Sequence, residues 1–246
     1  MNVLGIDIGG SGIKGALVDT ERGLLITERL RIPTPQPAKP KPIIQAIQTI
    51  TRHFNYQGPI GVGFPGVVID GVTHTAANLD NGWINYPATR HIALATRCEV
   101  IVRNDADAAA YAEMRHGAGR GHMGVVLLFT LGTGIGSAMF VRGEIVPNLE
   151  LGHIYLPNQQ RDAEYFASDR ARQELDLSWS EWGERLNTYF QYIEFLFSPN
   201  LIVIGGGVSK KHKKFLNHLT LRTEVVPAQL RNEAGIIGAA MAALSR

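Results

Sequence analysis

Two glycine-rich segments have the composition needed to bind phosphate groups. Gly9-Gly10-Ser11-Gly12 follows the apolar run 3–8, and Gly132-Thr133-Gly134 follows the apolar run 125–131. Apolar residues resume after each segment, so each is predicted to be the tip of a hairpin. Glycines at such a tip let backbone N–H groups converge on an anion without obstruction by side chains. For either segment alone, an ordinary tight turn is the alternative.

The two glycine segments belong to a longer repeat. Aligning them places Asp7 on Thr130 and Gly9 on Gly132, and each hairpin is followed by a polar turn that contains glycine. The G-x-x-x-x-G-K-[ST] loop is absent, and Gly132-Thr133-Gly134-Ile135-Gly136 has the wrong spacing for a dinucleotide-binding fingerprint and runs into a strand. The repeat therefore predicts two similar halves, each opening with a glycine-tipped hairpin.

A third glycine run strengthens the phosphate-binding interpretation. Gly205-Gly206-Gly207 ends the apolar run 201–204, and the hydroxyls of Thr130 and Thr133 add donors beside the second tip. Three such segments in one chain favour the binding of a phosphoryl donor over three unrelated turns.

Asp105 is the candidate for acid–base chemistry. It follows the predicted strand 99–102 and precedes a helix predicted from residue 106 to about 114. From this position α/β proteins present reactive groups to a ligand. The alternative is that Asn104 or Asp105 caps the helix, because Asn and Asp are good N-caps. The local sequence leaves both interpretations open.

Further polar residues are suited to a carbohydrate. Glu150 and His153 bring an acid and an imidazole three residues apart, and Asn78 and Trp83 add an amide and a flat apolar face. The alternatives are a structural histidine and an ordinary polar loop. Zinc is disfavoured because Cys98 is the only cysteine, and His plus Glu alone makes a poor structural zinc site.

A basic run follows the third glycine segment and consists of Lys210, Lys211, Lys213 and Lys214. The ordinary interpretation is a solvated helix face, and the alternative is a track that guides a long polyanion. Residues 197–246 hold seven Lys and Arg against two acidic residues, whereas the whole chain has 24 against 22 and a net charge of +2. The surface as a whole therefore does not require a polyanionic partner.

The elements that must position these residues alternate between strands and helices. The apolar fraction of 45%, the charged fraction of 19% and a mean hydropathy of −0.02 describe a soluble globular protein. A length of 246 residues suits one large or two small domains. Predicted strands cover 3–8, 13–18, 60–64, 99–102, 125–131, 137–141 and 201–204, and predicted helices cover 43–54, 106–114, 179–197 and 233–244. This alternation predicts an α/β fold.

Two other segments bear on class and location. The stretch 123–141 has no charged residue, but its central glycine turn favours two strands over a membrane span. The five prolines between residues 33 and 42 predict an extended surface stretch before the helix at 43. With no signal peptide pattern and one cysteine, we expect a reducing cytoplasm and no membrane partner.

Taken together, the motifs resemble the ROK family of repressors and sugar kinases, and most of all its polyphosphate glucokinases. The resemblance rests on segments 5–15, 63–68, 75–83, 104–109, 130–137, 147–153, 205–212 and 226–235, in this order and spacing. Most members carry a cysteine-rich zinc loop between the equivalents of His153 and Glu164. Residues 154–163 contain no cysteine, as in the polyphosphate subgroup, so no structural zinc is expected.

The resemblance implies an actin-like (ribonuclease-H-like) duplicated α/β fold with an active-site cleft between two domains. Residues 1–104, completed by the C-terminal helix 233–246, would form the first domain, and residues 105–232 the second. It further implies a homodimer without a nucleic-acid partner.

The resemblance also implies a reaction and its residues. Asp105 matches the catalytic base for phosphoryl transfer from inorganic polyphosphate to the 6-hydroxyl of glucose, and Asp7 is the expected Mg²⁺ ligand. The expected glucose-binding residues are Pro65, Gly66, Asn78, Asn104, Asp105, Glu150, His153 and Glu164. The expected donor-binding residues are Gly9, Gly10, Ser11, Gly12, Lys14, Thr130, Gly132, Thr133, Gly134, Gly206, Gly207, Lys210 and Lys211.

Two other functions remain open at this point. One is an ATP-dependent hexokinase acting on glucose, mannose or an N-acetylated sugar. The other is a sugar-sensing regulator, which is disfavoured because the first phosphate strand begins at Val3 and leaves no room for a DNA-reading segment.

Overall fold

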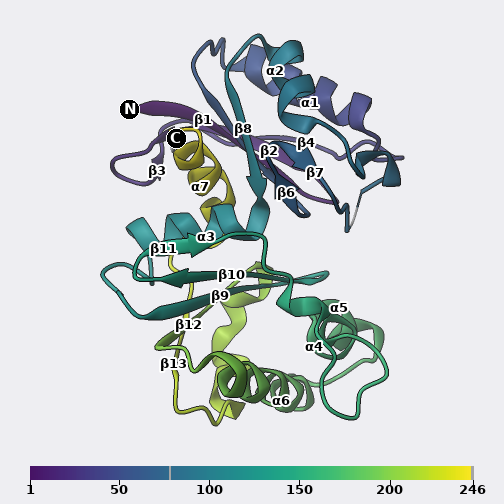
Figure 1. Cartoon of the computed structure of the whole chain (residues 1–246), viewed down its shortest axis with the longest axis vertical. Helices are drawn as coiled ribbons and strands as arrows, with labels where there is room; N and C mark the ends of the chain where they lie inside the picture. The colour runs from purple at the N-terminus through teal and green to yellow at the C-terminus, as the bar shows by residue number, and fades with distance from the viewer. Residues whose placement is uncertain (78, 245–246) are drawn as a thin grey trace. The chain divides into compact units, whose positions relative to one another are not determined.

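The computed structural model describes residues 1–77 and 79–244, which form two α/β units (Figure 1). The first unit consists of Met1–Ala112 and Glu233–Arg246, and the second of Glu113–Asn232. The sequence-based division lay between residues 104 and 105, whereas this division falls inside α3 (Asp105–His116). The early part of α3 packs against the C-terminal helix, where a side chain at Gly238 would overlap the carbonyl of Ala108.

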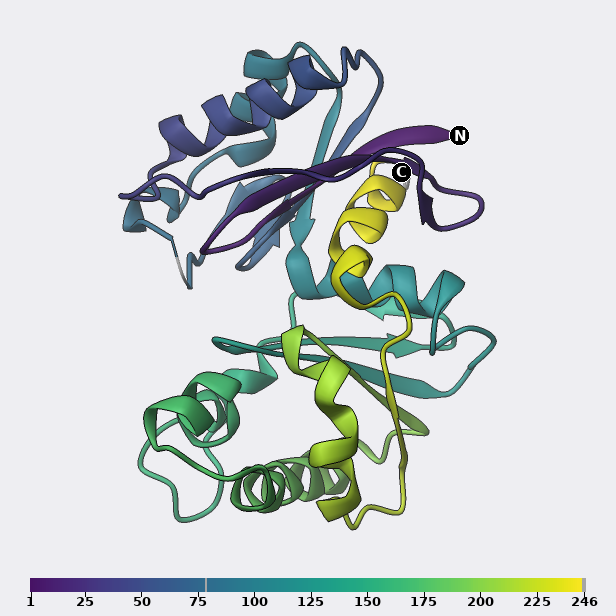
Figure 2. The same cartoon turned by 180° about the vertical axis from the view of Figure 1, so that it is seen from behind.

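The first unit is a sheet with helices on both faces. Its strands have the order β3-β2-β1-β5-β8, and β4 also pairs with β2. The bounds are β1 Asn2–Ile8, β2 Ile13–Asp19, β3 Leu24–Leu25, β4 Leu30–Ile32, β5 Ile60–Phe64 and β8 Val100–Asn104. Helices α1 (Pro40–His53) and α2 (Ala88–Thr96) cover one face, and α7 (Ala234–Ala242) covers the other (Figures 1 and 2). A small separate hairpin joins β6 (Val68–Ile69) to β7 (Val72–Thr73).

Glycines allow α7 to approach the first sheet closely. A Cβ atom at Gly5 would overlap the backbone of Ile236, and one at Gly61 would overlap the backbone of Ala239. Helix α7 is almost entirely buried and rich in alanine, so its backbone lies directly on β1 and β5. This contact fixes α7 against the middle of β1 and the first half of β5.

The second unit repeats the strand order of the first. Its sheet runs β11-β10-β9-β12-β13. The strand bounds are β9 Val125–Leu131, β10 Ile135–Val141, β11 Glu144–Val146, β12 Leu201–Gly205 and β13 Glu224–Pro227. The helices are α4 Ala163–Ala167, α5 Asp169–Glu174 and α6 Trp179–Phe197, and the aromatic core includes Phe129, Tyr189 and Phe190. The two halves predicted from the repeat are therefore present.

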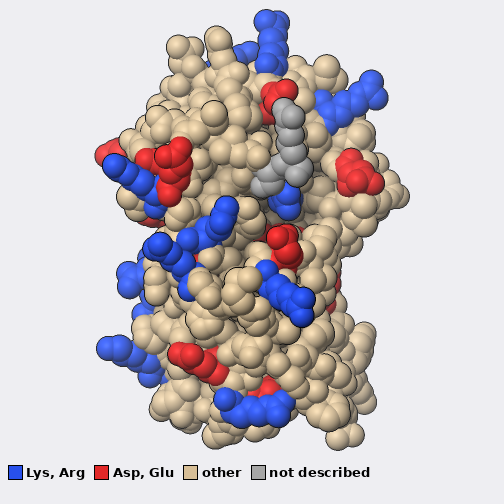
Figure 3. Space-filling view, turned by 60° about the vertical axis from the view of Figure 1, so that its left-hand side comes forward, with Lys and Arg blue, Asp and Glu red and all other residues tan. Residues whose placement is uncertain are grey.

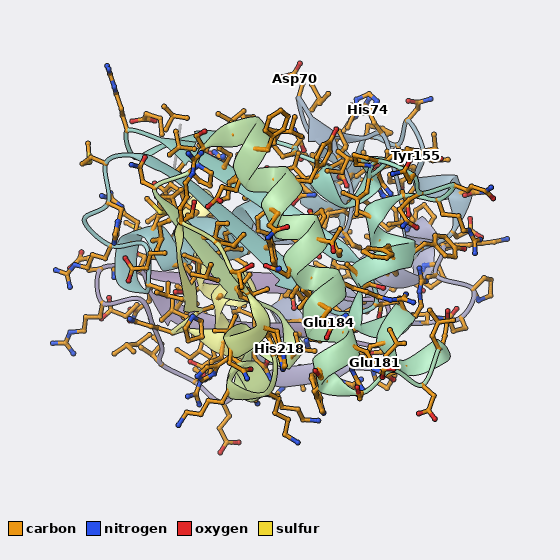
Figure 4. The ribbon with its side chains drawn as sticks, turned by 90° about the horizontal axis from the view of Figure 1, so that it is seen from below. Asp70, His74, Tyr155, Glu181, Glu184 and His218 are labelled. Atoms are coloured by element: carbon orange, nitrogen blue, oxygen red, sulfur yellow. The ribbon has the colours of Figure 1, made fainter. Side chains whose placement is uncertain are left out.

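Helix α6 begins and packs as its sequence dictates. Ser178 and Glu181 form a capping box, in which each side chain bonds to the backbone N–H of the other residue. Gly183 leaves room for His218, which lies beside the first turns of α6 near Glu181 and Glu184 (Figure 4). Short 3₁₀ segments complete the chain at Asn81–Trp83, Leu151–His153, Gly207–Lys214, Leu216–His218 and Arg231–Glu233.

The proline-rich segment differs from its prediction only where the helix begins. Helix α1 begins at Pro40 rather than at residue 43, because proline is tolerated in the first turn of a helix. Ala38 is buried, and its carbonyl accepts the indole N–H of Trp83 at 3.0 Å. Apart from Thr34 and Ala38, residues 33–39 are exposed or partly exposed and lie outside helices and strands, so the predicted surface stretch is confirmed before Pro40. Helix α2 and strand β13 were not predicted.

The uncharged stretch of the second unit forms strands, and charges of both signs are mixed on the surface. The uncharged stretch 123–141 forms the strands β9 and β10, and no helix within residues 1–77 and 79–244 is long and apolar enough to cross a membrane. On the face shown in Figure 3, basic and acidic side chains are interspersed, in keeping with the small net charge.

Candidate active site

Two carboxylates meet at the carboxyl end of the first sheet. Strands β1, β5 and β8 are parallel neighbours, with Asp7 paired to Gly63 in register. A Cβ atom built on Gly63 would lie 3.7 Å from Cβ of Asp105 and 3.8 Å from Oδ1 of Asp7. Asp7 and Asp105 therefore flank one glycine at the strand ends where α/β proteins bind ligands.

Asn104, rather than Asp105, is the residue that caps α3. Its Oδ1 accepts the backbone N–H of Asp107 at 3.0 Å, and its Nδ2 donates to the carbonyl of Gly66 at 3.1 Å. Asn104 is only 5% exposed, so it fastens the Pro65-Gly66 turn to the helix start. Asp105 is partly exposed, and its Oδ1 accepts the N–H of Ala106. The capping role is thus filled by its neighbour.

Asp7 lies between a cation and a helix start. Its Oδ2 is 3.5 Å from Nζ of Lys14, and Gly235 in the first turn of α7 faces its carboxyl group. Burial raises the pKa of Asp7, and the nearby charge of Lys14 opposes this shift. A helix N-terminus favours the ionised form as well.

Asp7 has the ligand chemistry that Mg²⁺ prefers. Mg²⁺ in phosphoryl-transfer sites is held through one or two carboxylates together with substrate phosphates. Among the residues that the structure describes, no group of three or more His, Cys, Asp or Glu is arranged to hold a metal. A magnesium ion at Asp7 would therefore depend on the phosphates of a bound donor.

The first glycine tip is closed on itself and fastened from outside. The N–H of Gly9 donates across the tip to the carbonyl of Gly12 at 3.1 Å. The hydroxyl of Thr34 donates to the carbonyl of Gly9 at 2.5 Å, and Nη2 of Arg31 donates to that of Ser11 at 2.7 Å. The Arg31 guanidinium occupies the space that a side chain at Gly12 would need.

The second glycine tip is fastened by Glu164 and Arg170. The N–H of Gly132 donates to the carbonyl of Gly134 at 3.0 Å, and the N–H of Arg170 donates to the carbonyl of Gly132 at 3.2 Å. Oε2 of Glu164 accepts the N–H of Ile135 at 3.0 Å, while its Oε1 lies 3.3 Å from Nη2 of Arg170. Glu164 was predicted to bind sugar, which stays a prediction; in the structure its carboxylate anchors this tip.

The third glycine segment rests on the base of the second hairpin. Gly206 has φ of 80° and touches the backbone of Leu131 where a side chain would stand, so only glycine fits. Its carbonyl accepts the hydroxyl of Ser209 at 2.8 Å. The second and third candidate phosphate-binding segments are therefore neighbours within the second unit.

His153 lies between carboxylates. Its Nδ1 is 2.8 Å from Oδ2 of Asp162, and its Nε2 is 3.9 Å from Oε2 of Glu150. Burial lowers the pKa of His153, but the hydrogen bond to Asp162 and the charges of Glu164, Asp162 and Glu150 outweigh it and raise the pKa. Burial raises the pKa of Glu150, with an opposing contribution from His153. Because the His153 side chain is 49% exposed, it is not a core histidine.

Asp162 and Arg170 were missed by the sequence analysis. Asp162 caps α4 through Oδ1, which accepts the N–H of Tyr165 at 3.1 Å, so an Asp before a helix was its detectable signal. Its bond to His153 depends on the bridge between Tyr155 and Asp162, which sequence spacing does not reveal. No local pattern marks Arg170.

Of the two residues of the predicted sugar loop, one lies in the core and the other is outside the described residues. Trp83 is completely buried and its indole N–H is bonded to Ala38, so it belongs to the core and offers no exposed face to a sugar. Asn78 lies outside the described residues. The remaining predicted donor residues, Thr130, Thr133 and Lys14, lie at or beside the glycine tips, with Thr133 exposed.

The fold and these loops define a sugar kinase of the ROK type. Residues 3–164 match the model of the ROK family, and the chain belongs to this family. It has the duplicated, actin-like α/β fold of ROK sugar kinases.

The similar proteins include glucokinases and a glucomannokinase. The chain is 44% identical over 242 residues to a polyphosphate glucokinase of Mycobacterium tuberculosis, covering 98% of this chain and 91% of that protein. It is 48% identical to the inorganic polyphosphate/ATP-glucomannokinase from Arthrobacter sp. strain KM, with a TM-score of 0.94 and coverage of 98% of each chain. A ROK family glucokinase from Streptomyces griseus, solved with glucose and AMPPNP, is 26% identical, with a TM-score of 0.84 and coverage of 98% of each chain.

Proposed function

We propose that this protein is a polyphosphate-dependent glucokinase, which transfers a phosphoryl group from inorganic polyphosphate to the 6-hydroxyl of glucose. The observation that carries the proposal is the 44% identity to a polyphosphate glucokinase over nearly the whole chain. The pair of closed glycine tips and the Asp105 carboxylate, which follows the N-cap residue Asn104, are the groups that we assign to such a reaction.

Asp105 is proposed as the general base. Phosphoryl transfer has a loose transition state, so the protein contributes mainly positioning and charge neutralisation. The Asp105 carboxylate accepts the proton of the glucose 6-hydroxyl as the oxygen–phosphorus bond forms, and the remaining polyphosphate chain leaves with the electrons of the broken bond. Asn104 supports this step by fixing the helix start and the Pro65-Gly66 turn.

Glu150, His153 and Glu164 are proposed to orient the sugar through its other hydroxyls. The raised pKa of His153 keeps its ring protonated to a higher pH, so that both ring nitrogens are donors while the neighbouring carboxylates accept. This pairing of donors and acceptors suits neighbouring hydroxyl groups, each of which both donates and accepts.

The glycine tips are proposed to bind the donor phosphates, with Lys14 adding positive charge beside the first tip. A Mg²⁺ ion held by Asp7 and the donor phosphates would offset their negative charge. We also propose that the protein works as a homodimer in the cytoplasm; both follow from the likeness to the family and not from a contact in this chain.

ATP is the second candidate donor. The Arthrobacter relative is described as a polyphosphate/ATP-glucomannokinase, and the Streptomyces griseus glucokinase was solved with AMPPNP. The same name makes mannose the first alternative sugar to test.

A donor panel tests the proposal. Glucose 6-phosphate formation is measured with glucose and Mg²⁺, comparing nucleotide-free polyphosphate with ATP at equal concentrations of transferable phosphate. We expect activity with polyphosphate. Activity with ATP alone would overturn the donor assignment and keep the kinase, while no product with either donor on glucose, mannose or an N-acetylated sugar would overturn the kinase.

A further inference from the structure

Three cationic side chains gather around one tryptophan ring in the second unit. The guanidinium carbon of Arg172 in α5 lies 4.2 Å from the ring centroid of Trp179, the first residue of α6. The ammonium groups of Lys211 and Lys214 lie 5.5 Å and 5.6 Å from the same centroid. We call Arg172, Trp179, Lys211 and Lys214 the Trp179 cluster.

The ring at the centre of the cluster is held in place by the core. It lies nearly parallel to Phe215, with an interplanar angle of 18° and centroids 6.2 Å apart, and edge-on to Trp182 at 5.7 Å. Phe215 and Trp182 are completely buried, whereas Trp179 is partly exposed. The cations therefore converge on a rigid platform with access to solvent.

The positive charge of the cluster exceeds its acidic partners. Arg172 pairs with Asp169 at 2.7 Å. Neither Lys211 nor Lys214 has an ion pair with any described residue. The carboxylate of Glu181, on the first turn of α6, is bonded to Ser178 in the capping box. Cations that gather around a ring repel one another, and an anion bound among them removes this repulsion.

The cluster also distinguishes among the four lysines of the basic run. Lys211 and Lys214 approach the ring, whereas neither Lys210 nor Lys213 is in contact with an aromatic ring of the described residues. Lys211 is five residues from Gly206 along a 3₁₀ segment, which at about 2 Å per residue is a path on the order of 10 Å. A donor must extend beyond the glycine segments to reach the cluster.

We propose that the Trp179 cluster binds the distal phosphates of a long polyphosphate chain, away from the phosphoryl group that is transferred. The inference rests on the proposed function for the identity of the polyanion. This binding site is more specific than the polyanion track that the basic run suggests. Arg172, Lys211 and Lys214 contribute to it, and Lys213 does not.

Binding without turnover is the first test. Trp179 is the one partly exposed tryptophan, since Trp83 and Trp182 are buried, so its fluorescence reports on the cluster. Long-chain polyphosphate and tripolyphosphate are titrated into the wild type and into Lys211→Ala/Lys214→Ala. The matched control is Lys213→Ala/Arg120→Ala, which removes the same charge from exposed positions of the same unit.

We expect long-chain affinity to fall about tenfold or more in the Lys211→Ala/Lys214→Ala variant and less than about threefold in the control. Tripolyphosphate affinity should differ little between the two double variants. Equal losses of long-chain affinity in both variants would show that the Trp179 cluster is not a polyphosphate-binding site. Tighter binding of a single-stranded nucleic acid than of polyphosphate of the same charge would show the same.

Steady-state kinetics separates this inference from the proposed function. In the cluster variant KM for long-chain polyphosphate should rise, while KM for tripolyphosphate and for glucose stays near the wild-type value. If the wild type makes no glucose 6-phosphate but the two variants differ in binding as expected, the proposed glucokinase activity is wrong and polyphosphate binding by the Trp179 cluster is supported. If the wild type is active and KM for long-chain polyphosphate rises equally in both variants, the proposed activity is supported and polyphosphate binding by the Trp179 cluster is wrong.

Discussion

The two units build the same hairpin and fasten it with opposite charges. In both, the first glycine of the tip donates its N–H across the tip, from Gly9 to Gly12 and from Gly132 to Gly134. In both, the carbonyl of that first glycine accepts a bond from a neighbouring segment. The first tip is then held by a cation, Arg31, and the second by a carboxylate, Glu164.

The two units differ in the residues near the carboxyl ends of β1 and β9. Asp7 ends β1 beside Asp105, whereas the position equivalent to Asp7 in β9 is Thr130. The acids in the second unit are Glu150, Asp162 and Glu164, which surround His153 or anchor the tip. We propose that the glycine tips of both units bind donor phosphates and that the general base belongs to the first unit alone.

The largest effect is expected at Asp105. Asp105→Asn should lower kcat about 10²-fold to 10⁴-fold, because the amide cannot accept the hydroxyl proton. The Kd for glucose should change less than about threefold, since Asn retains the size and polarity of the side chain. Kinetics and calorimetry with glucose alone measure the two quantities.

Asp107→Asn is the matched control for this variant. It makes the same acid-to-amide change two residues later in the first turn of α3. We expect it to keep most of kcat. If the Asp105→Asn enzyme is as active as the Asp107→Asn control, Asp105 is not the general base.

The next effect is expected at Glu164. Glu164→Ala leaves the N–H of the buried Ile135 without its acceptor and should lower the free energy of unfolding by about 1–3 kcal/mol. Glu164→Gln should lose less, because its side-chain oxygen can still accept this N–H while the pair with Arg170 is lost. Urea denaturation checks both variants, and equal losses in Gln and Ala would show that the ion pair, and not the anchor of the tip, carries the effect.

The sequence predicted the repeated framework better than the groups that fasten it. The hairpins follow from apolar runs broken by glycines, and residues 179–197 form a helix with the predicted bounds. The bonds of Arg31 to Ser11 and of Glu164 to Ile135 join residues 20 and 29 positions apart, so no local pattern reveals them. Trp83 was misassigned because an aromatic residue in a polar loop gives no sign that its ring points into the core.

The acidic surroundings of His153 predict a pH-dependent contribution to stability. The pKa of His153 is raised above its ordinary value of 6.5, so the pair with Asp162 contributes fully below that pH and is lost as pH rises through the folded-state pKa. The contribution is at most about 1 kcal/mol, because solvent screens a half-exposed pair. Asp162→Asn keeps a good helix cap and removes the charge.

Thermal unfolding of the wild type and Asp162→Asn at several pH values above about 6 measures this contribution. We expect the wild type to be more stable than the variant at the lowest pH and the difference to shrink as pH rises. A difference independent of pH would contradict the pairing.

The smallest effect is expected at Arg31. Arg31→Ala removes an exposed cation of β4 that is bonded to the first tip, and the free energy of unfolding should fall by less than about 1 kcal/mol. KM for polyphosphate should rise no more than about fivefold, since the glycine N–H groups remain. A loss of stability as large as that of Glu164→Ala would mean that both tips depend equally on their anchors.

Transfer of labelled phosphate to glucose tests polyphosphate as the donor and Asp105 as the base in one measurement. Radiolabelled polyphosphate free of nucleotide is incubated with glucose and Mg²⁺, and the label is traced in the wild type and in Asp105→Asn. The role of Asp105 as general base predicts labelled glucose 6-phosphate from the wild type and almost none from the variant. Label that never reaches the sugar, or that reaches it equally fast in both proteins, would contradict it.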